Sequence, residues 1–102
     1  AEALEVTAAW VSAGVAAGRG GFCLCHGLAG NAEILVECAD ARPGDGARLR
    51  VLADAVARAG VENHLSGERP WPCGAPGGES PGLMTGLAGI ALFYMRRAAP
   101  AP

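Results

Sequence analysis

The chain has 102 residues, of which 51% are hydrophobic and 18% are charged, and its formal net charge is −2. Such a composition is typical of one small globular domain and excludes a largely disordered chain. The basic residues are eight scattered arginines, and aromatic residues make up only 5% of the chain. We therefore expect no nucleic-acid partner, because that function needs a basic surface with interleaved aromatic side chains.

The apolar stretch Val6–Ala17 is interrupted by Thr7 and Ser12. It is shorter than the about 20 apolar residues that a helix needs to cross a bilayer, and it lacks the positively charged start of a signal peptide. Without an export signal, the four cysteines are more naturally thiols or metal ligands in a reducing compartment than disulfides. We therefore expect a cytoplasmic protein with no membrane span.

Apolar residues at helical spacing predict two helices in the first half of the chain. We expect the first over Ala3–Ala17 and the second from Leu28 until Arg42-Pro43-Gly44 closes it. Because both helices are apolar on most sides, we expect them to have several neighbours. The stripe residues are Leu4, Ala8, Val11 and Val15 in the first helix, and Leu28, Ala32, Leu35 and Ala39 in the second, where Ile34 and Cys38 widen the stripe.

A third helix is predicted over Asp45–Ala59, with Asp45 as its N-cap and Gly60 as its C-cap. One face of this segment is apolar, while arginines and an aspartate lie along the other at four-residue spacing. The pattern indicates a surface helix.

The remaining sequence predicts a long loop and one more helix. Prolines and glycines over Val61–Leu83 indicate the loop, in which His64 is expected to be solvated. The apolar segment Leu87–Met95 predicts the last helix. It ends at Arg96-Arg97, which we interpret as a helix-end charge pair.

An internal repeat organises the chain. Leu24–Gly30 aligns with Leu83–Gly89 and matches it at five of seven positions, including an identical Gly-Leu-Ala-Gly. A glycine-spaced start, an apolar helix and a returning amphipathic helix are typical of two-layered helical repeats. Because such repeats need about three units to bury a continuous core, we expect the chain to be part of a larger protein.

The first copy of the repeat contains Cys25-His26 where the second has Met84-Thr85. A thiolate and an imidazole are preferred zinc ligands, and a catalytic zinc keeps three protein ligands and one open position. From the spacing alone, a buried cysteine beside a hydrogen-bonded core histidine explains the pair equally well. Of the other cysteines, Cys23 and Cys73 are candidate spare ligands, and Cys38 is expected in the core.

Two longer motifs carry a resemblance to a known family. The segments Leu24-Cys25-His26-Gly27-Leu28-Ala29-Gly30-Asn31 and Pro81-Gly82-Leu83-Met84-Thr85-Gly86-Leu87-Ala88-Gly89-Ile90 closely resemble two successive motifs of the lanthionine synthetase C-like (LanC-like) cyclases. The intervening Trp71-Pro72-Cys73-Gly74 is similar to a loop of the bifunctional LanM class, in which a dehydratase precedes the cyclase. The resemblance covers nearly the whole chain.

The resemblance implies an all-α fold, a fragment of an α/α toroid in which the helices beginning at Gly27 and Gly86 are inner. It also implies a zinc ion held by Cys25, His26 and one more cysteine. In the family that cysteine and the other acid/base residues lie upstream, so residues 1–102 are expected to be the C-terminal portion of a cyclase domain, inactive alone. His26 is a candidate for proton transfer as well as a ligand.

The implied reaction is lanthipeptide biosynthesis: a zinc-activated peptide cysteine adds to a dehydroalanine or dehydrobutyrine of a dehydrated precursor peptide. The expected partners are that peptide and the upstream part of the same synthetase. Two alternatives remain open. The chain is a non-catalytic helical remnant or binding module without a complete zinc site, or it belongs to a LanC-like protein that acts on glutathione.

Overall fold

A computed structural model describes residues 2–17, 21–25, 27–41, 44, 46–66, 69–74 and 79–98. These residues form four α-helices and a short π-helix: α1 (Glu2–Ala17), α2 (Leu28–Ala41), α3 (Gly46–Gly60), η1 (Val61–Leu65) and α4 (Leu87–Ala98). The predicted all-α class is confirmed, and it is consistent with a fragment of an α/α toroid. Among the described helices, none has the length and apolar character needed to cross a membrane.

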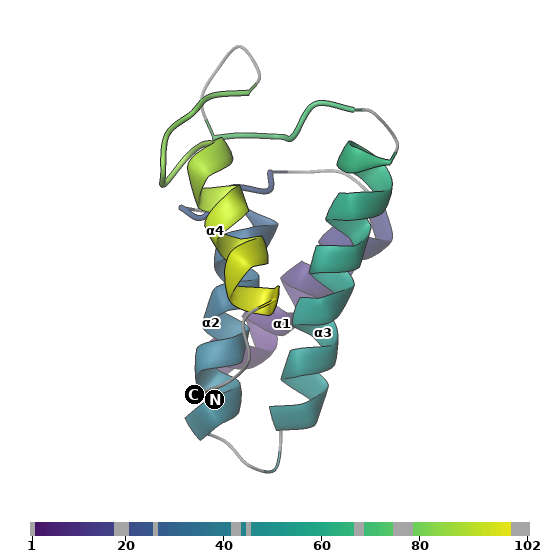
Figure 1. Cartoon of the computed structure of the whole chain (residues 1–102). Helices are drawn as coiled ribbons and strands as arrows, with labels where there is room; N and C mark the ends of the chain where they lie inside the picture. Colours follow the sequence, from purple (N-terminus) through teal and green to yellow (C-terminus); the bar gives the residue numbers. More distant parts are fainter. Residues whose placement is uncertain are drawn as a thin grey trace.

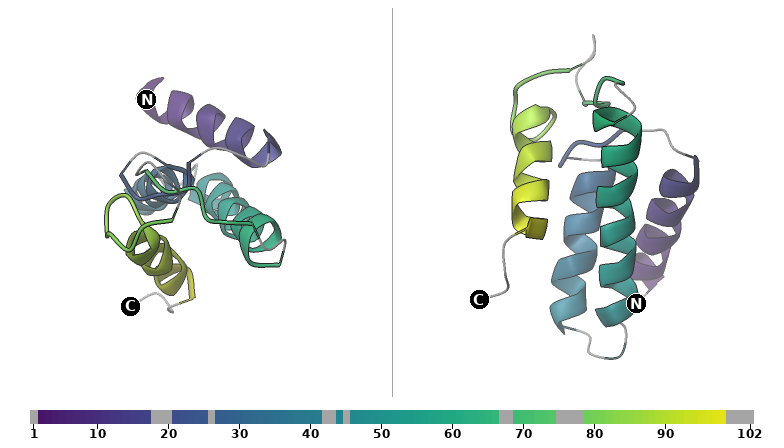
Figure 2. Two further views of the ribbon diagram at one scale, coloured as in Figure 1. Left: turned by 90° about the horizontal axis from the view of Figure 1, so that it is seen from above. Right: turned by 45° about the vertical axis from the view of Figure 1, so that its right-hand side comes forward.

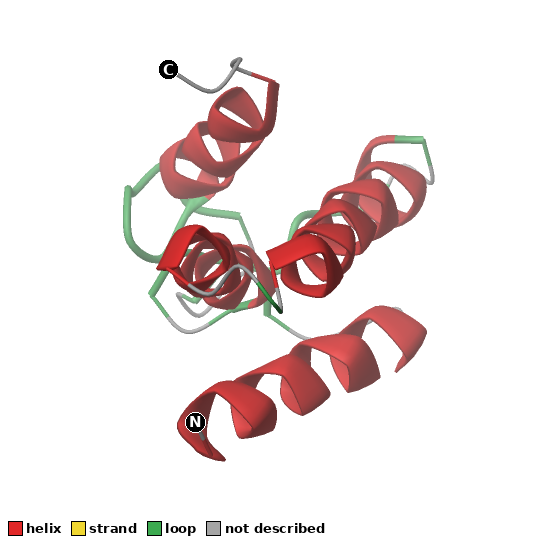
Figure 3. Cartoon of the chain, turned by 90° about the horizontal axis from the view of Figure 1, so that it is seen from below, coloured by secondary structure: helices red, strands yellow, loops and turns green. Residues whose placement is uncertain are grey.

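The hairpin of α2 and α3 forms the centre of the molecule (Figure 1). Helix α1 packs on one side of this pair and α4 packs on the other, and each of them contacts both central helices. Figure 2 and Figure 3 show α1 and α4 on opposite sides of the pair. Helix α2 therefore has neighbours on three sides, which explains its many small and apolar residues.

The predicted apolar stripes form the core. Their buried members are Leu4, Ala8 and Val11 in α1, Leu28, Ala32, Leu35 and Ala39 in α2, Leu49, Ala53 and Val56 in α3, and Ile90 and Phe93 in α4. One expectation is wrong, because Ile34 does not widen the stripe of α2 but is 52% exposed. Ile34 instead lines a groove between α2 and α4.

The two copies of the repeat make the same local contacts. The Leu28 N–H donates to the Gly21 carbonyl at 2.9 Å, and the corresponding Leu87 N–H donates to Ser80 at 2.6 Å. A Cβ added at Gly30 would collide with the Leu24 carbonyl oxygen, and one at Gly89 would collide in the same way with Leu83. Glycine is therefore required where each helix start crosses the preceding turn.

Helix α3 ends at Gly60, but Gly60 is not the C-cap that the sequence predicted. Its backbone is helical, with φ −62° and ψ −46°, and the chain continues directly into η1. A Cβ at Gly60 would collide with the Tyr94 hydroxyl and lie 3.0 Å from the Trp71 ring. Close packing by aromatic side chains, rather than a left-handed turn, explains this glycine.

Charged residues join α2 to α4. Helix α4 extends past the predicted end, and its last turn contains Arg96 and Arg97. The carboxylate of Glu33 lies 3.2 Å from Arg96 Nη1 and 3.5 Å from Arg97 Nη2, and Glu37 lies 3.4 Å from Arg96 Nη2. The predicted helix-end charge pair thus also bridges to the neighbouring helix.

We predict that Gly30→Ala destabilises the chain by about 2–3 kcal/mol, because the added methyl group must displace backbone rather than a flexible side chain. Gly44→Ala is the control, since a Cβ at Gly44 meets nothing within 4 Å, and it should change stability by less than about 0.5 kcal/mol. Urea unfolding of both variants measures the difference. Equal effects would contradict the proposed collision.

We predict a similar contrast between two glutamates of α2. Glu33→Gln should cost about 1–3 kcal/mol, because both Glu33 oxygens are buried and face two arginines. Glu37→Gln removes one exposed ion pair and should cost less than about 1 kcal/mol. Thermal unfolding near neutral pH compares the variants. An equal loss of stability would show that the buried ion pairs of Glu33 stabilise the chain no more than the exposed pair of Glu37.

Candidate functional site

Cys25 lies in the turn that precedes α2, and its side chain is exposed. The backbone of this turn is fixed on two sides. The Cys25 N–H donates to the Met84 carbonyl at 2.7 Å, and the carbonyl of Cys23 accepts from Gly27 at 3.0 Å and from Gly30 at 3.2 Å. An exposed thiol on such a fixed turn is available to a metal ion or a substrate.

The hydrogen bond from Cys25 to Met84 joins equivalent positions of the two repeat copies. A second contact lies beside it, since a Cβ at Gly89 would come within 2.9 Å of Leu24 Cδ1. The two helix starts are thus side by side, with the Leu24 side chain of the first copy over the glycine of the second. The second copy supplies the scaffold against which the Cys25 turn rests.

His26, the second predicted ligand and the candidate for proton transfer, lies outside the described residues, as do Asp45, Arg42 and Pro43. Its two roles remain predictions. Within the described part of the chain, no three histidine, cysteine, aspartate or glutamate side chains come together in a way that could hold a metal ion. Cys25 fits a zinc ion as one ligand, and the described donor set is incomplete without others.

The other cysteines differ from Cys25 in how exposed they are to solvent. All four are free thiols. Cys23 is 0% exposed, so a ligand role for it would require the core to open. Cys38 and Cys73 are half-buried and pack against the core, which agrees with the expectation for Cys38 and leaves Cys25 as the accessible thiol of the repeat.

Residues Trp71–Gly74, which we call the strap, cross both helix starts. The Pro72 carbonyl accepts a hydrogen bond from the Phe22 N–H at 2.8 Å, and the Gly74 N–H donates to the Thr85 carbonyl at 2.8 Å. The strap therefore ties the turn that contains Cys25 to its counterpart in the second copy. The proline-rich sequence predicted a loop here, but its hydrogen bonds depend on tertiary contacts.

An aromatic cluster lies beneath one end of the strap, formed by Phe22, His64, Trp71, Phe93 and Tyr94. His64 is half-buried rather than fully solvated as expected. Its ring lies 4.9 Å from the Trp71 ring and 6.1 Å from the Phe22 ring, measured between centroids. The sequence did not reveal this cluster, whose members are far apart in the chain.

Burial affects both titratable members of the cluster. It lowers the pKa of His64, and the nearby Arg69 charge lowers it further, while the backbone of Pro70 and Arg69 partly offsets the shift. Burial also raises the pKa of Tyr94 to about 12, with a smaller opposing contribution from the Val61 backbone. The Tyr94 hydroxyl donates to the Ala57 carbonyl at 2.7 Å. Both groups are thus favoured in their neutral forms near pH 7.

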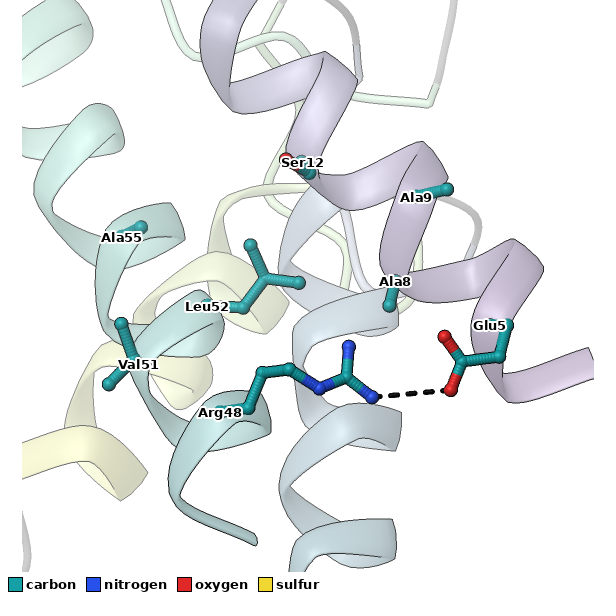
Figure 4. A pocket seen from close by; sticks show the side chains of 8 residues that line it. All are labelled: Glu5, Ala8, Ala9, Ser12, Arg48, Val51, Leu52 and Ala55. Atoms are coloured by element: carbon teal, nitrogen blue, oxygen red, sulfur yellow. Dashed lines mark hydrogen bonds and ion pairs between the residues drawn. The ribbon is translucent and has the colours of Figure 1, made fainter. Parts of the chain in front are cut away.

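Two grooves flank the central helices. The groove between α2 and α4, of about 380 Å³, begins at Leu24 and Met84 beside the Cys25 turn. The other, of about 460 Å³, lies between α1 and α3 (Figure 4), and the ion pair of Glu5 and Arg48, at 3.2 Å, closes one edge. Only the first groove is continuous with the turn that presents the thiol.

Comparison with protein families supports the resemblance. A family model described as "Lanthionine synthetase C-like protein" matches residues 4–102. Comparison with curated proteins and with solved structures gave no match. Because the family match spans nearly the whole chain and agrees with the repeat and the all-helical fold, the chain belongs to the lanthionine synthetase C-like family.

Proposed function

We propose that this chain is the C-terminal portion of a zinc-dependent lanthionine cyclase of the LanM type. The main support for this proposal is the exposed thiol of Cys25, which lies on a fixed turn at the position where the second copy of the repeat has Met84. A scaffold role alone does not require a thiol there, because Met84 occupies the equivalent position. The family match supports the assignment.

Cys25 and His26 would hold the zinc ion together with a cysteine from the upstream part of the synthetase. Zinc, when bound, would lower the pKa of a substrate thiol that occupies its open position. The chain's own contribution is positional. The hydrogen bond from Cys25 to Met84 and the strap keep the ligand turn in one place while a peptide approaches.

The proposed substrate is a dehydrated precursor peptide. Its cysteine sulfur forms a bond to the β-carbon of a dehydroalanine or dehydrobutyrine, and the electrons of the carbon–carbon double bond move toward the carbonyl oxygen as an enolate. The substrate thiol loses its proton when the sulfur attacks, and one proton added at the α-carbon completes the thioether, so the addition has no leaving group. As the alternative to its role as a ligand, we assign delivery of that proton to His26, which lies next to Cys25 in the sequence.

The upstream part of the synthetase is the proposed partner. In the described interface, Leu24 and the Cys25 N–H of the first copy contact the second copy. The equivalent residues of the second copy, Leu83 and Met84, are each 53% exposed, and the Met84 N–H has no backbone partner among the described residues. We propose that another helix start of the same type covers this edge. The four free thiols suit the proposed cytoplasmic location.

A non-catalytic remnant is the second candidate, favoured by the incomplete set of metal donors in the described residues. Zinc content distinguishes it from a cyclase. An enzyme acting on glutathione remains the third reading, and the thioether products formed from glutathione and from a dehydrated peptide would separate it from the first.

We predict that the synthetase containing this chain and its upstream region binds one zinc ion per polypeptide, and that Cys25→Ser removes most of it. Cys38→Ser is the control, because Cys38 packs against the core away from the Cys25 turn, and it should keep the metal. Metal analysis by mass spectrometry measures both. If the unaltered synthetase contains no zinc, the hypothesis of a non-catalytic remnant is favoured. If Cys25→Ser keeps the full zinc content, Cys25 is not a zinc ligand.

We also predict that Leu83→Asp weakens association between this chain and a separately expressed upstream region by about tenfold, because it places a charge at the proposed apolar contact. Leu65→Asp is the control, since Leu65 is 65% exposed and lies on η1, away from this edge. Titration calorimetry gives both dissociation constants. Equal values for the two variants would contradict docking at the Leu83–Met84 edge.

A further inference from the structure

Few contacts hold the strap in place. Its hydrogen bonds to other described residues are the two main-chain bonds to Phe22 and Thr85 and a bond of 3.0 Å from the Trp71 N–H to Glu79 Oε2. Just before it, Arg69 Nε donates to the Asn63 carbonyl on η1 at 3.1 Å. Besides these bonds, Cys73 packs against the core, and the Trp71 ring packs among other aromatic side chains.

The Trp71 ring is held by aromatic neighbours from three elements. It lies 5.3 Å from Phe22 in the first turn, 5.7 Å from Tyr94 on α4 and 4.9 Å from His64 on η1, measured between ring centroids. Of these three neighbours, His64 is closest and is the one that gains a charge between pH 5 and 8. The others keep their charge state, since the pKa of Tyr94 is about 12.

We propose that His64 is a pH-sensitive latch: the neutral imidazole holds the strap across the two helix starts, and protonation of His64 releases it. The imidazolium would have to remain packed between Phe22 and Trp71, where water cannot solvate it fully. Moving the strap away restores that solvation. The latch requires no metal ion and no substrate.

The positive charge of Arg69 acts in the same direction. Arg69, which lies just before the strap, repels an imidazolium, and the Pro70 and Arg69 backbone offsets this repulsion only in part. Phe22 and Trp71 are uncharged. Glu62 on the same π-helix is exposed, and Glu79 is engaged with the Trp71 N–H. Because the pKa of His64 is lowered when the strap is closed, closure is fully favoured above about pH 6.5 and weakens as the pH falls toward the lowered value.

Release of the strap would remove hydrogen bonds close to the turn that contains Cys25. Phe22, whose N–H loses its Pro72 partner, lies three residues before Cys25 in the sequence. Thr85, whose carbonyl loses Gly74, follows Met84, the acceptor for the Cys25 N–H. Mild acid would therefore loosen both sides of the contact that positions the candidate ligand.

We predict a fluorescence titration that reports the latch directly. In a Trp10→Phe background, Trp71 is the remaining tryptophan, and its emission should change with a midpoint below pH 6.5. The change should be absent in Trp10→Phe/His64→Phe, where the ring packing is kept without a titrating group. Arg69→Gln, which removes the repelling charge, should raise the midpoint. A midpoint at or above pH 6.5, or a titration that persists without His64, would overturn the proposal.

Amide hydrogen exchange distinguishes release of the strap from protonation of His64 without movement of the strap. After correction for intrinsic rates, the Phe22 and Gly74 amides should exchange faster below pH 6.5, by up to about tenfold per pH unit within the transition. The Asn31 amide, bonded to Gly27 within the first helix start, is the internal reference and should not follow. Exchange at Phe22 and Gly74 that stays constant relative to Asn31, or that accelerates equally in His64→Phe, would refute release of the strap.

Discussion

The close approach of each helix start to the turn before it is the constraint on which the site depends. At Gly30 and Gly89 the backbone of the helix lies against a carbonyl oxygen, leaving no room for a Cβ. This approach sets the turns of the two copies side by side, so that the Cys25 N–H reaches the Met84 carbonyl. The position of the candidate ligand follows from glycine sterics rather than from any contact of its own side chain.

Helices α2 and α4, which begin at the two repeat starts, are connected at both ends by different interactions. Near the turns, the join consists of main-chain hydrogen bonds, the Leu24 side chain and the strap. At the other end of α4, the ion pairs of Glu33 with Arg96 and Arg97 connect it to α2. Ile90 and Phe93 of α4 also belong to the same apolar core as α1, α2 and α3, so apolar packing lies between these two sets of contacts.

The aromatic cluster connects the surface helix α3 to this arrangement. Because Gly60 has no side chain, Tyr94 and Trp71 can pack against the end of α3, and η1 continues the helix far enough to place His64 beside Trp71. The same packing buries two titratable groups and shifts the pKa of each toward its neutral form. The same aromatic side chains thus hold the strap and make its proposed position depend on pH.

The sequence by itself determined the four helices, most of their buried faces, the repeat and the special position of Cys25, because these depend on local periodicity and on glycine spacing. It did not determine the role of Gly60, the exposure of Ile34 or the aromatic contacts of His64, since each depends on which distant residues pack nearby. Only the tertiary structure brought Cys25 to Met84 and laid the strap over both turns. The contacts of Cys25 with Met84 and of Phe22 with Pro72 join segments about fifty to sixty residues apart in the chain, and no local pattern specifies them.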